Sequence, residues 1–230
     1  MRIPSLRIIS ALALAFVAPL APLASAGELE LKVRILHTAD LHGALAGWDD
    51  WQDRPAAKGL ERVASLVAAA RAKGDSTLLL DAGDALHGSQ LERVWREGPR
   101  RAPEPVVAAM NALGYDALAV GNHEFDAGRE SLESAIAAAH FPFLAANVVD
   151  TRTGRPAFGT SLVREFEGAR IGIIGLTTPA APMLMDSVLC AGLTFLDPLE
   201  VARTEIARLR GAERCQAVIA LVHMGLEREP

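Results

Sequence analysis

The sequence predicts an α/β fold with mostly parallel strand pairing and one antiparallel hairpin. Short apolar runs typical of strands alternate with segments whose apolar residues recur at helical spacing. Residues with metal-binding side chains follow several of the apolar runs directly, which is where sites lie in such sheets. Two further runs flank Gly168-Ala169, and this spacing is a hairpin signal.

The first half of the chain provides the clearest element boundaries. Residues 31–37 alternate and then run apolar, as a first strand does. A helix is predicted over residues 59–73, where apolar side chains recur at helical spacing and Gly74 is a C-cap signal. A second helix over 105–113 begins at Pro105 and ends before Gly114. The strands between and after these helices are 77–81 and 117–120.

The second half continues the alternation. Residues 129–139 are predicted as a helix and 143–145 as a short strand. Segments 161–167 and 170–175 form the hairpin, 198–209 a helix and 217–222 a buried strand. Residues 47–57 and 98–105 are expected to be irregular loops. Trp48 and Trp51 in the first loop either line a pocket or pack the loop on itself.

Four polar motifs follow four of the predicted strands. They are Asp40-x-His42, Gly83-Asp84, Gly121-Asn122-His123-Glu124 and Val222-His223-Met224-Gly225. Each motif alone is weak, because a lone Gly-Asp is usually a turn and a lone His at a strand end is usually structural. All four in this order favour a site where carboxylate, amide and imidazole ligands hold two metal ions.

The spacing suggests how the ligands would divide between two ions. Asp40 and His42 lie two residues apart, so on an extended segment both side chains point the same way and can hold one ion. Gly83 permits a tight turn, after which Asp84 can bridge the two ions. Asn122 and His223 would then bind the second ion. We expect Glu124 to support its loop rather than take part in chemistry.

Three of these segments closely resemble the calcineurin-like metallophosphoesterases, and in particular their secreted 5′-nucleotidase branch. The segments are ILHTADLH (35–42), LLDAGD (79–84) and VGNHEFD (120–126), and IGIIGLTTP (171–179) is also similar to that branch. The resemblance implies a two-sheet sandwich flanked by helices. It also implies that His123 meets the transferring phosphate and Asp126 orients His123, while Asp40, His42, Asp84, Asn122 and His223 bind metal.

The sequence departs from the family pattern in two places. Ala39 stands where the family commonly has Asn. The family also has a downstream Gly-His-x-His-like segment and a C-terminal nucleotide-binding domain, neither of which occurs before Pro230. We therefore expect residues 27–230 to be a partial catalytic domain, incomplete at the C-terminus. The 230-residue chain would then be poorly soluble and at least about a hundredfold less active than an extended one. The factor is scaled from the loss of activity known for substitutions just outside the ligands of a metal site.

Composition and the N-terminal segment indicate the binding partners and the location of the protein. The net charge is −5 without a basic block, which argues against nucleic acid polymers as partners. Residues 1–26 read as a signal peptide, with Arg2 and Arg7, an apolar run and Ala24-Ser25-Ala26 as a cleavage site. We expect a secreted or periplasmic protein without a membrane span after cleavage; the alternative is an uncleaved anchor. Cys190 and Cys215 either pair or are two small buried residues.

The expected function is hydrolysis of phosphate monoesters, foremost 5′-nucleotides, by a hydroxide held on two divalent ions. Zn, Mn, Fe and Co all suit the mixed ligands. One alternative is a relative that acts on cyclic nucleotides, nucleotide sugars or sulfur esters. The other is a truncated, inactive chain that at most binds metal. Three more histidines have open roles: His37 as support for the site or a buried residue, His87 near the substrate, and His140 as a helix-end cation.

Overall fold

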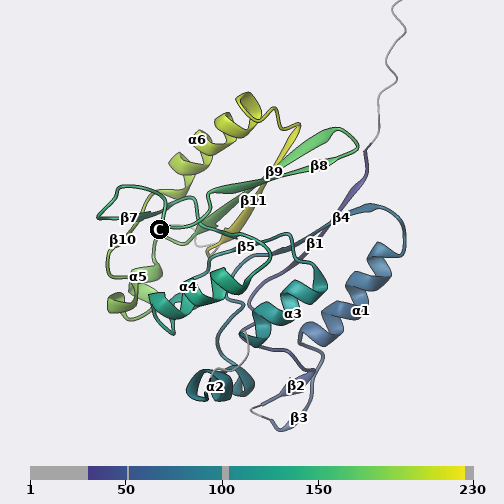
Figure 1. The fold of residues 1–230 in the computed structure, drawn as a ribbon, viewed down its shortest axis with the longest axis vertical. Helices are drawn as coiled ribbons and strands as arrows, with labels where there is room; N and C mark the ends of the chain where they lie inside the picture. The colour runs from purple at the N-terminus through teal and green to yellow at the C-terminus, as the bar shows by residue number, and fades with distance from the viewer. Residues whose placement is uncertain (1–30, 51, 100–103, 226–230) are drawn as a thin grey trace, which may run out of the picture. The chain divides into compact units, whose positions relative to one another are not determined.

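The computed structural model describes residues 31–50, 52–99 and 104–225 (Figure 1). The predicted signal peptide, residues 1–26, lies outside the described residues, as does Trp51. Among the helices that are described, none combines the length and apolar character needed to cross a membrane.

A four-stranded parallel sheet carries most of the predicted motifs. Its order is β1-β4-β5-β6, and its strands are β1 Val33–Thr38, β4 Ser76–Asp81, β5 Ala117–Ala119 and β6 Phe143–Leu144. The crossovers between parallel neighbours run through α1 Leu60–Arg71, α3 Pro105–Leu113 and α4 Arg129–Ala138. Helix α3 has the predicted bounds, and Gly114 ends it with φ 68°, a left-handed cap that glycine adopts without strain.

A second sheet has the order β11-β9-β8, with β8 Ser161–Phe166, β9 Ala169–Thr177 and β11 Ala217–His223. Strands β8 and β9 form the predicted antiparallel hairpin, in which Phe166 pairs with Ala169. The turn is therefore Glu167-Gly168, one residue earlier than predicted, and both residues have positive φ, as two-residue hairpin turns often require. Strand β11 pairs in parallel with β9 after helix α6 Pro198–Gly211.

The two sheets pack face to face between two helical layers. In β4, Leu79 packs with residues of α1, α3 and α4, while Leu78 and Leu80 pack with Ile171, Ile173 and Leu221 of the second sheet. The other face of the second sheet meets α6 through Leu209. Figure 1 shows α6 on one side of the sheets and α1, α3 and α4 on the other. The expected two-sheet sandwich flanked by helices is confirmed.

Strand β11 corrects one prediction. Residues 217–222 were expected to be buried, but of these only Leu221 is buried and Val222 is 38% exposed. The reason is position: β11 pairs with β9 alone among the described residues, so it lies at the edge of its sheet. Edge strands keep one row of backbone groups free of ladder partners.

Several short elements had no clear signal in the sequence. They are β2 Trp48–Asp49, β3 Arg54–Pro55, α2 Gln90–Glu97, the 3₁₀ turns η1 His123–Phe125 and η2 Ser187–Cys190, β7 Val148–Asp150, α5 Ala181–Leu184 and β10 Leu193–Phe195. Strands β2 and β3 pair with each other inside the expected loop 47–57, and β7 pairs with β10. All of these except α2 have two to four residues, too few for periodicity to reveal.

Candidate metal centre

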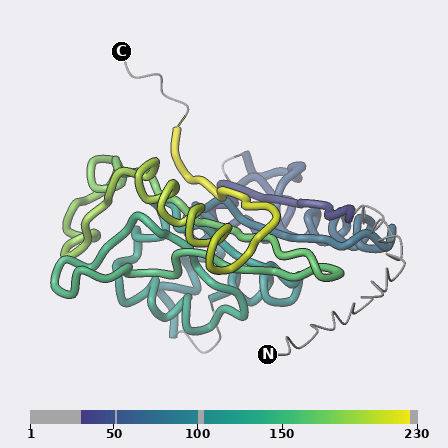
Figure 2. The backbone as a smooth tube through the Cα atoms, turned by 90° about the horizontal axis from the view of Figure 1, so that it is seen from above, coloured from purple at the N-terminus to yellow at the C-terminus, as the bar shows by residue number. Residues whose placement is uncertain are grey.

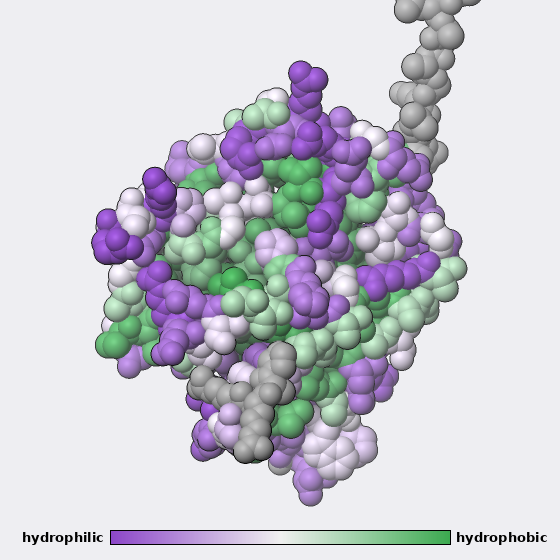
Figure 3. Space-filling model, in the orientation of Figure 1, coloured by the Kyte–Doolittle hydropathy of each residue, from purple (hydrophilic) through white to green (hydrophobic). Residues whose placement is uncertain are grey.

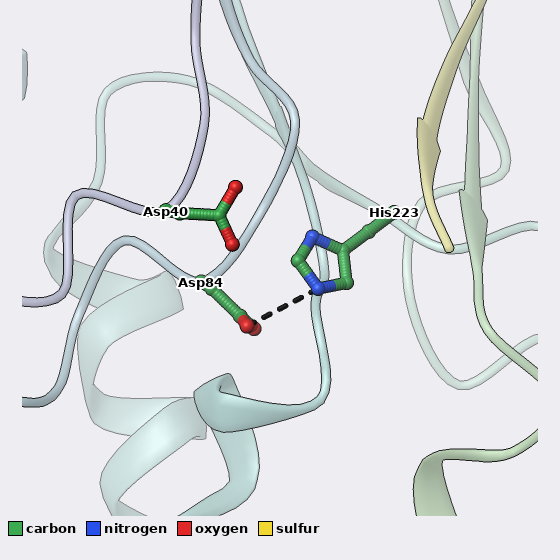
Figure 4. Close-up of side chains that lie close together, drawn as sticks. All are labelled: Asp40, Asp84 and His223. Carbon is green, nitrogen blue, oxygen red and sulfur yellow. Dashed lines mark ion pairs between the residues drawn. The ribbon is translucent and has the colours of Figure 1, made fainter. Parts of the chain in front are cut away.

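The four motifs meet where β1, β4, β5 and β11 end. One ligand atom from each of Asp40, Asp84 and His223 lies within 4.8 Å of the others. Figure 4 shows these three side chains pointing toward one another from three separate segments. In Figure 2 the yellow end of β11 lies beside the purple segment that contains β1, although the two are far apart in the sequence.

The loop after β1 holds Asp40 and His42 against the loop after β4. The amides of Asp40 and His42 donate to the carbonyls of Gly83 and Asp84, each at 2.9 Å. The expected extended segment is wrong, because Asp40 and His42 have φ of 52° and 47°. Their side chains nevertheless converge: His42 Nε2 lies 3.9 Å from Asp40 Oδ1. Left-handed backbone at non-glycine residues is uncommon and gathers at functional sites.

Asp84 occupies the middle of the cluster and is only 4% exposed. Its Oδ1 accepts from the His123 amide at 2.8 Å, and its Oδ2 lies 3.2 Å from His223 Nε2. The preceding Gly83 has φ 106°, and a Cβ there would lie 2.8 Å from His223 Nδ1. Gly83 is therefore required both for the turn and for the approach of His223.

Two histidines have one ring nitrogen bonded to backbone, which fixes the direction of the other. His223 Nδ1 donates to the Ala82 carbonyl at 2.9 Å, and His42 Nδ1 to the His87 carbonyl at 3.2 Å. Nε2 of each ring is then the nitrogen available for a metal, in the arrangement typical of metal-binding histidines. Asn122 Oδ1 lies 3.3 Å from His223 Nε2.

His123 and Asp126 form a hydrogen-bonded pair at the side of the cluster. His123 Nδ1 lies 2.8 Å from Asp126 Oδ2, and the His123 ring is 5.3 Å from the ring of His42, edge to face. Partial burial works to lower the pKa of His123, but the hydrogen bond and charge of Asp126 raise it above its ordinary value. The contact with Asp126 thus fixes the orientation of the His123 ring beside the cluster.

Glu124 joins the loops after β4 and β5 from a fully buried position. Its carboxylate accepts four backbone N–H groups, from Asp84 at 2.8 Å, Ala85 at 2.7 Å, Leu86 at 3.2 Å and Gly121 at 2.6 Å. Burial raises the pKa of Glu124, the charge of Asp84 raises it further, and the N–H groups oppose both. These contacts agree with the expectation that Glu124 supports its loop.

Asp84 of the first sheet's loops and His223 of the second sheet each shift the pKa of the other. Burial works to raise the pKa of Asp84, but the hydrogen bonds from His223 and from the His123 amide hold it below the ordinary value. Burial works to lower the pKa of His223, yet its hydrogen bond and charge interaction with Asp84 raise it to about 9. In the protein without metal, a proton on His223 therefore balances the Asp84 carboxylate.

Asp81 also supports the site, although no motif in the sequence pointed to it. It is fully buried, accepts from Thr38 Oγ1 at 2.5 Å and from the Gly83 amide at 2.9 Å, and so fixes the turn before Asp84. Burial raises its pKa to about 8. A signal was present, because Asp81 is a carboxylate at the end of the apolar run Leu78–Leu80.

The remaining histidines and the cysteines do not join the cluster. His37 and His140 are exposed, whereas His87 is buried with Nδ1 3.1 Å from Glu92 Oε1, so its ring has a structural partner. Cys190 and Cys215 are buried free thiols in separate parts of the core. The two cysteines therefore do not pair with each other, and each is a small buried residue of the core.

The cluster fits a divalent metal by its chemistry. Carboxylate oxygens, an amide oxygen and two imidazole nitrogens form a mixed oxygen and nitrogen donor set, and both imidazoles are oriented by backbone carbonyls. Such a centre at the carboxyl edge of an α/β sandwich is an arrangement that metal-dependent hydrolases use.

Comparison with known proteins places the chain within that class. The sequence profile of the calcineurin-like phosphoesterases matches residues 33–173, which is more than half of the chain. The chain belongs to this family, whose members use divalent metals.

Individual relatives agree with this assignment. The chain is 36% identical to a 2′,3′-cyclic-nucleotide 2′-phosphodiesterase/3′-nucleotidase of Yersinia enterocolitica, over 86% of this chain and 32% of the relative. It is 35% identical to a 5′-nucleotidase of Vibrio cholerae, over 94% of this chain and 39% of the relative. It therefore spans roughly a third of the length of these curated relatives.

A solved structure supports the fold as well. The crystal structure of the calcineurin-like phosphoesterase YfkN from Bacillus subtilis superposes with a TM-score of 0.76 at 31% identity. The match covers 85% of this chain and 63% of that one.

Proposed function

We propose that this chain hydrolyses phosphate esters of nucleotides, in the first place 5′-nucleotides, at a site that holds two divalent metal ions. The observation that carries the proposal is the convergence of Asp40, Asp84 and His223 within 4.8 Å. His42 and Asn122 lie close enough to that cluster to complete two neighbouring ligand sets.

Asp84 is the bridging ligand in this proposal. Its two oxygens face different partners, the His123 amide and His223 Nε2, and it is the more buried of the two acidic ligands. Asp40 and His42 would bind one ion, and Asn122 and His223 the other. Mixed ligands of this kind suit Zn, Mn, Fe or Co.

When bound, the ions would polarise the phosphoryl group and activate the attacking water. The chain's own groups would orient the ester and handle its protons. His123, held by Asp126 at 2.8 Å and with its pKa raised, can stabilise charge on the phosphoryl oxygens or protonate the leaving oxygen. In this proposal Nδ1 pairs with Asp126, and Nε2 would face the substrate.

The named relatives support nucleotides as the substrate class, since one is a 5′-nucleotidase and another acts on 2′,3′-cyclic nucleotides and as a 3′-nucleotidase. A small phosphate ester suits a site of net negative protein charge because metals supply the local positive charge. The apolar run and the small residues at 24–26 support a secreted or periplasmic location.

The test is product release by the purified chain. The chain is stripped with a chelator, reloaded with Mn, Zn or Co, and offered AMP, 3′-AMP and 2′,3′-cyclic AMP, with products separated by chromatography. We expect adenosine and phosphate from AMP with metal and none after chelation. If no substrate is hydrolysed with any metal, the proposed function is wrong for this chain.

A further inference from the structure

His87 is a buried histidine that the proposed reaction does not use. It follows Asp84 closely in the loop after β4 and is 6% exposed. Its backbone carbonyl accepts the hydrogen bond from His42 Nδ1 at 3.2 Å. That bond leaves Nε2 of the His42 ring available for an ion. The direction in which His42 points therefore depends on where the His87 backbone lies.

The His87 side chain has one hydrogen-bond partner among the described residues. Its Nδ1 lies 3.1 Å from Glu92 Oε1, whereas its Nε2 is buried and has no such partner there. The contact with Glu92 is therefore the polar interaction that fixes the orientation of this ring. Without it, the ring could turn about χ2, a torsion whose preferences are broad and roughly two-fold.

Glu92 faces the protein interior in spite of its charge. It lies in α2 and is 2% exposed, although charged side chains are almost never fully buried unless they are paired. The outward side of α2 is mixed surface: Figure 3 shows hydrophilic (purple) and hydrophobic (green) side chains together around its place at the lower end of the view. The buried carboxylate is paired on two sides, because Arg96 Nε donates to Glu92 Oε1 at 3.0 Å.

These partners keep the Glu92 carboxylate an acceptor. Burial works to raise its pKa, but the hydrogen bond and charge of His87 and the charge of Arg96 hold the pKa below the ordinary value. An ionised carboxylate accepts hydrogen bonds and donates none, so His87 Nδ1 is the donor in their contact.

The segment between His87 and Glu92 is packed against the loop that holds His42. Gly88 has φ 131°, and a Cβ there would lie 3.0 Å from the Cβ of His42. Ser89 is the N-cap of α2, and its Oγ accepts from the Glu92 amide at 3.1 Å. A shift of this first helical turn would therefore move the His87 carbonyl relative to the His42 ring.

We propose that His87 is a positioning residue of the metal centre: its ring, held by Glu92, fixes the backbone carbonyl that orients His42 toward one of the two ions. The inference deepens the proposed function and rests on it for the assignment of His42 as a metal ligand. It implies an unequal effect on the two ions, because His42 belongs to one ligand set and His223 to the other. Loss of the His87 ring should weaken the ion bound through His42 and spare the other.

The first test measures the binding of each ion separately. Mn²⁺ is titrated by calorimetry into the chelator-treated chain, and His42→Ala and His223→Ala identify which binding event belongs to which ligand set. We expect His87→Leu, which keeps the bulk without the polar nitrogens, to weaken the event that depends on His42 by about 10–100-fold, the usual loss for a group that supports a metal ligand. The event that depends on His223 should keep its affinity.

Two further variants test the contact itself. In His87→Asn the amide nitrogen can take the place of Nδ1 and donate to Glu92, so most of the affinity lost in His87→Leu should return. Glu92→Gln changes the same contact from the other side without leaving a cavity, and it should weaken the same event by a smaller factor. If His87→Leu does not fold, as judged by circular dichroism, Glu92→Gln decides by the same comparison.

Val67→Ala is the matched control for a loss of stability. Val67 is buried on α1, and shortening it should favour neither binding event over the other. His140→Ala, which removes an exposed histidine, should bind both ions like the wild type.

A second readout needs no metal. The ring nitrogens of neutral His42 are observed by nitrogen NMR in the chelator-treated chain, where Nδ1 should carry the proton because it donates to a carbonyl. We expect a mixture of the two tautomers in His87→Leu and a return to the single tautomer in His87→Asn. A general loss of stability, as in Val67→Ala, would not move this proton.

The outcomes separate this inference from the proposed function. Wild-type affinity for both ions in His87→Leu, or an equal loss for both, overturns the positioning role whatever the chain hydrolyses. A wild-type chain that binds no Mn²⁺ overturns it as well. A selective loss that His87→Asn restores, in a chain that hydrolyses no substrate, supports the positioning role and overturns only the proposed function.

Discussion

The two sheets reach the candidate metal centre in different ways. In the first sheet, the loops after β1, β4 and β5 are joined through backbone hydrogen bonds and through the buried Glu124 carboxylate. The second sheet contributes one side chain, His223, from the end of a half-exposed edge strand. The His223 ring contacts the Ala82 carbonyl, Asp84 and Asn122 of the first sheet and its loops.

The two sheets therefore have different roles at this site. The first sheet provides a scaffold whose geometry is held without metal, and such preorganised groups bind ions without reorganisation. The position of His223 depends instead on the packing of Leu221 and Ile219 against the first sheet. Substitutions in the loops of the first sheet and at His223 should therefore have different effects.

Asp84→Asn should have the largest effect, because it removes the central carboxylate of the first sheet. We expect turnover of AMP to fall by more than about a thousandfold, beyond the usual loss of a single stabilising group, with less metal bound. Activity and metal content are measured together. Asp53→Asn is the control, since Asp53 is exposed and has φ of 48°, similar to Asp84. Normal turnover with full metal content in Asp84→Asn would contradict the bridging assignment.

His123→Ala should reduce the rate by about 10²–10³-fold and leave most of the metal in place. The reason is that His123 pairs with Asp126 beside the cluster and contributes only its backbone amide to Asp84. Metal analysis and kcat distinguish the two roles, with the exposed His140→Ala as control. Loss of metal in His123→Ala would identify His123 as a ligand instead.

Glu124→Gln should weaken metal binding by about 10–100-fold, as substitutions just outside a ligand set do. An amide offers one oxygen where the carboxylate accepts four N–H groups through two. Competition with a metal indicator dye measures the affinity. Glu130→Gln, an exposed change on α4, should bind metal like the wild type, and equal affinity in both variants would show that the first sheet needs no such support.

The smallest effect concerns His223 in the chain without metal. Its folded pKa of about 9 lies above the ordinary value, so the stabilisation is present below about pH 6.5 and is lost as the pH rises through about 9. Urea unfolding with chelator should show a fall of about 1–2 kcal/mol between pH 7 and 10 that is missing in His223→Ala. His37→Ala should follow the wild type. Parallel curves for all three proteins would mean that the two sheets are not coupled through this pair.

Much of the fold could be predicted from the sequence because its signals are local. Pro105 and Gly114 mark the ends of α3 in the chain itself, and the apolar runs before Asp40, Asp84 and Asn122 predict strands whose ends carry the motifs. Backbone preference and side-chain periodicity act between near neighbours, so they are readable without coordinates. The family resemblance rests on the same local segments.

The tertiary structure decided how these segments meet. Asn122 and His223 are 101 residues apart in the chain and 3.3 Å apart in space, a contact set by the packing of one sheet on the other. The left-handed conformations of Asp40 and His42 arise where their loop is bonded to the loop after β4, and no pattern in D-x-H predicts them. The half-exposed state of β11 also depends on which surfaces are covered, because burial is a property of the packed chain and not of any segment alone.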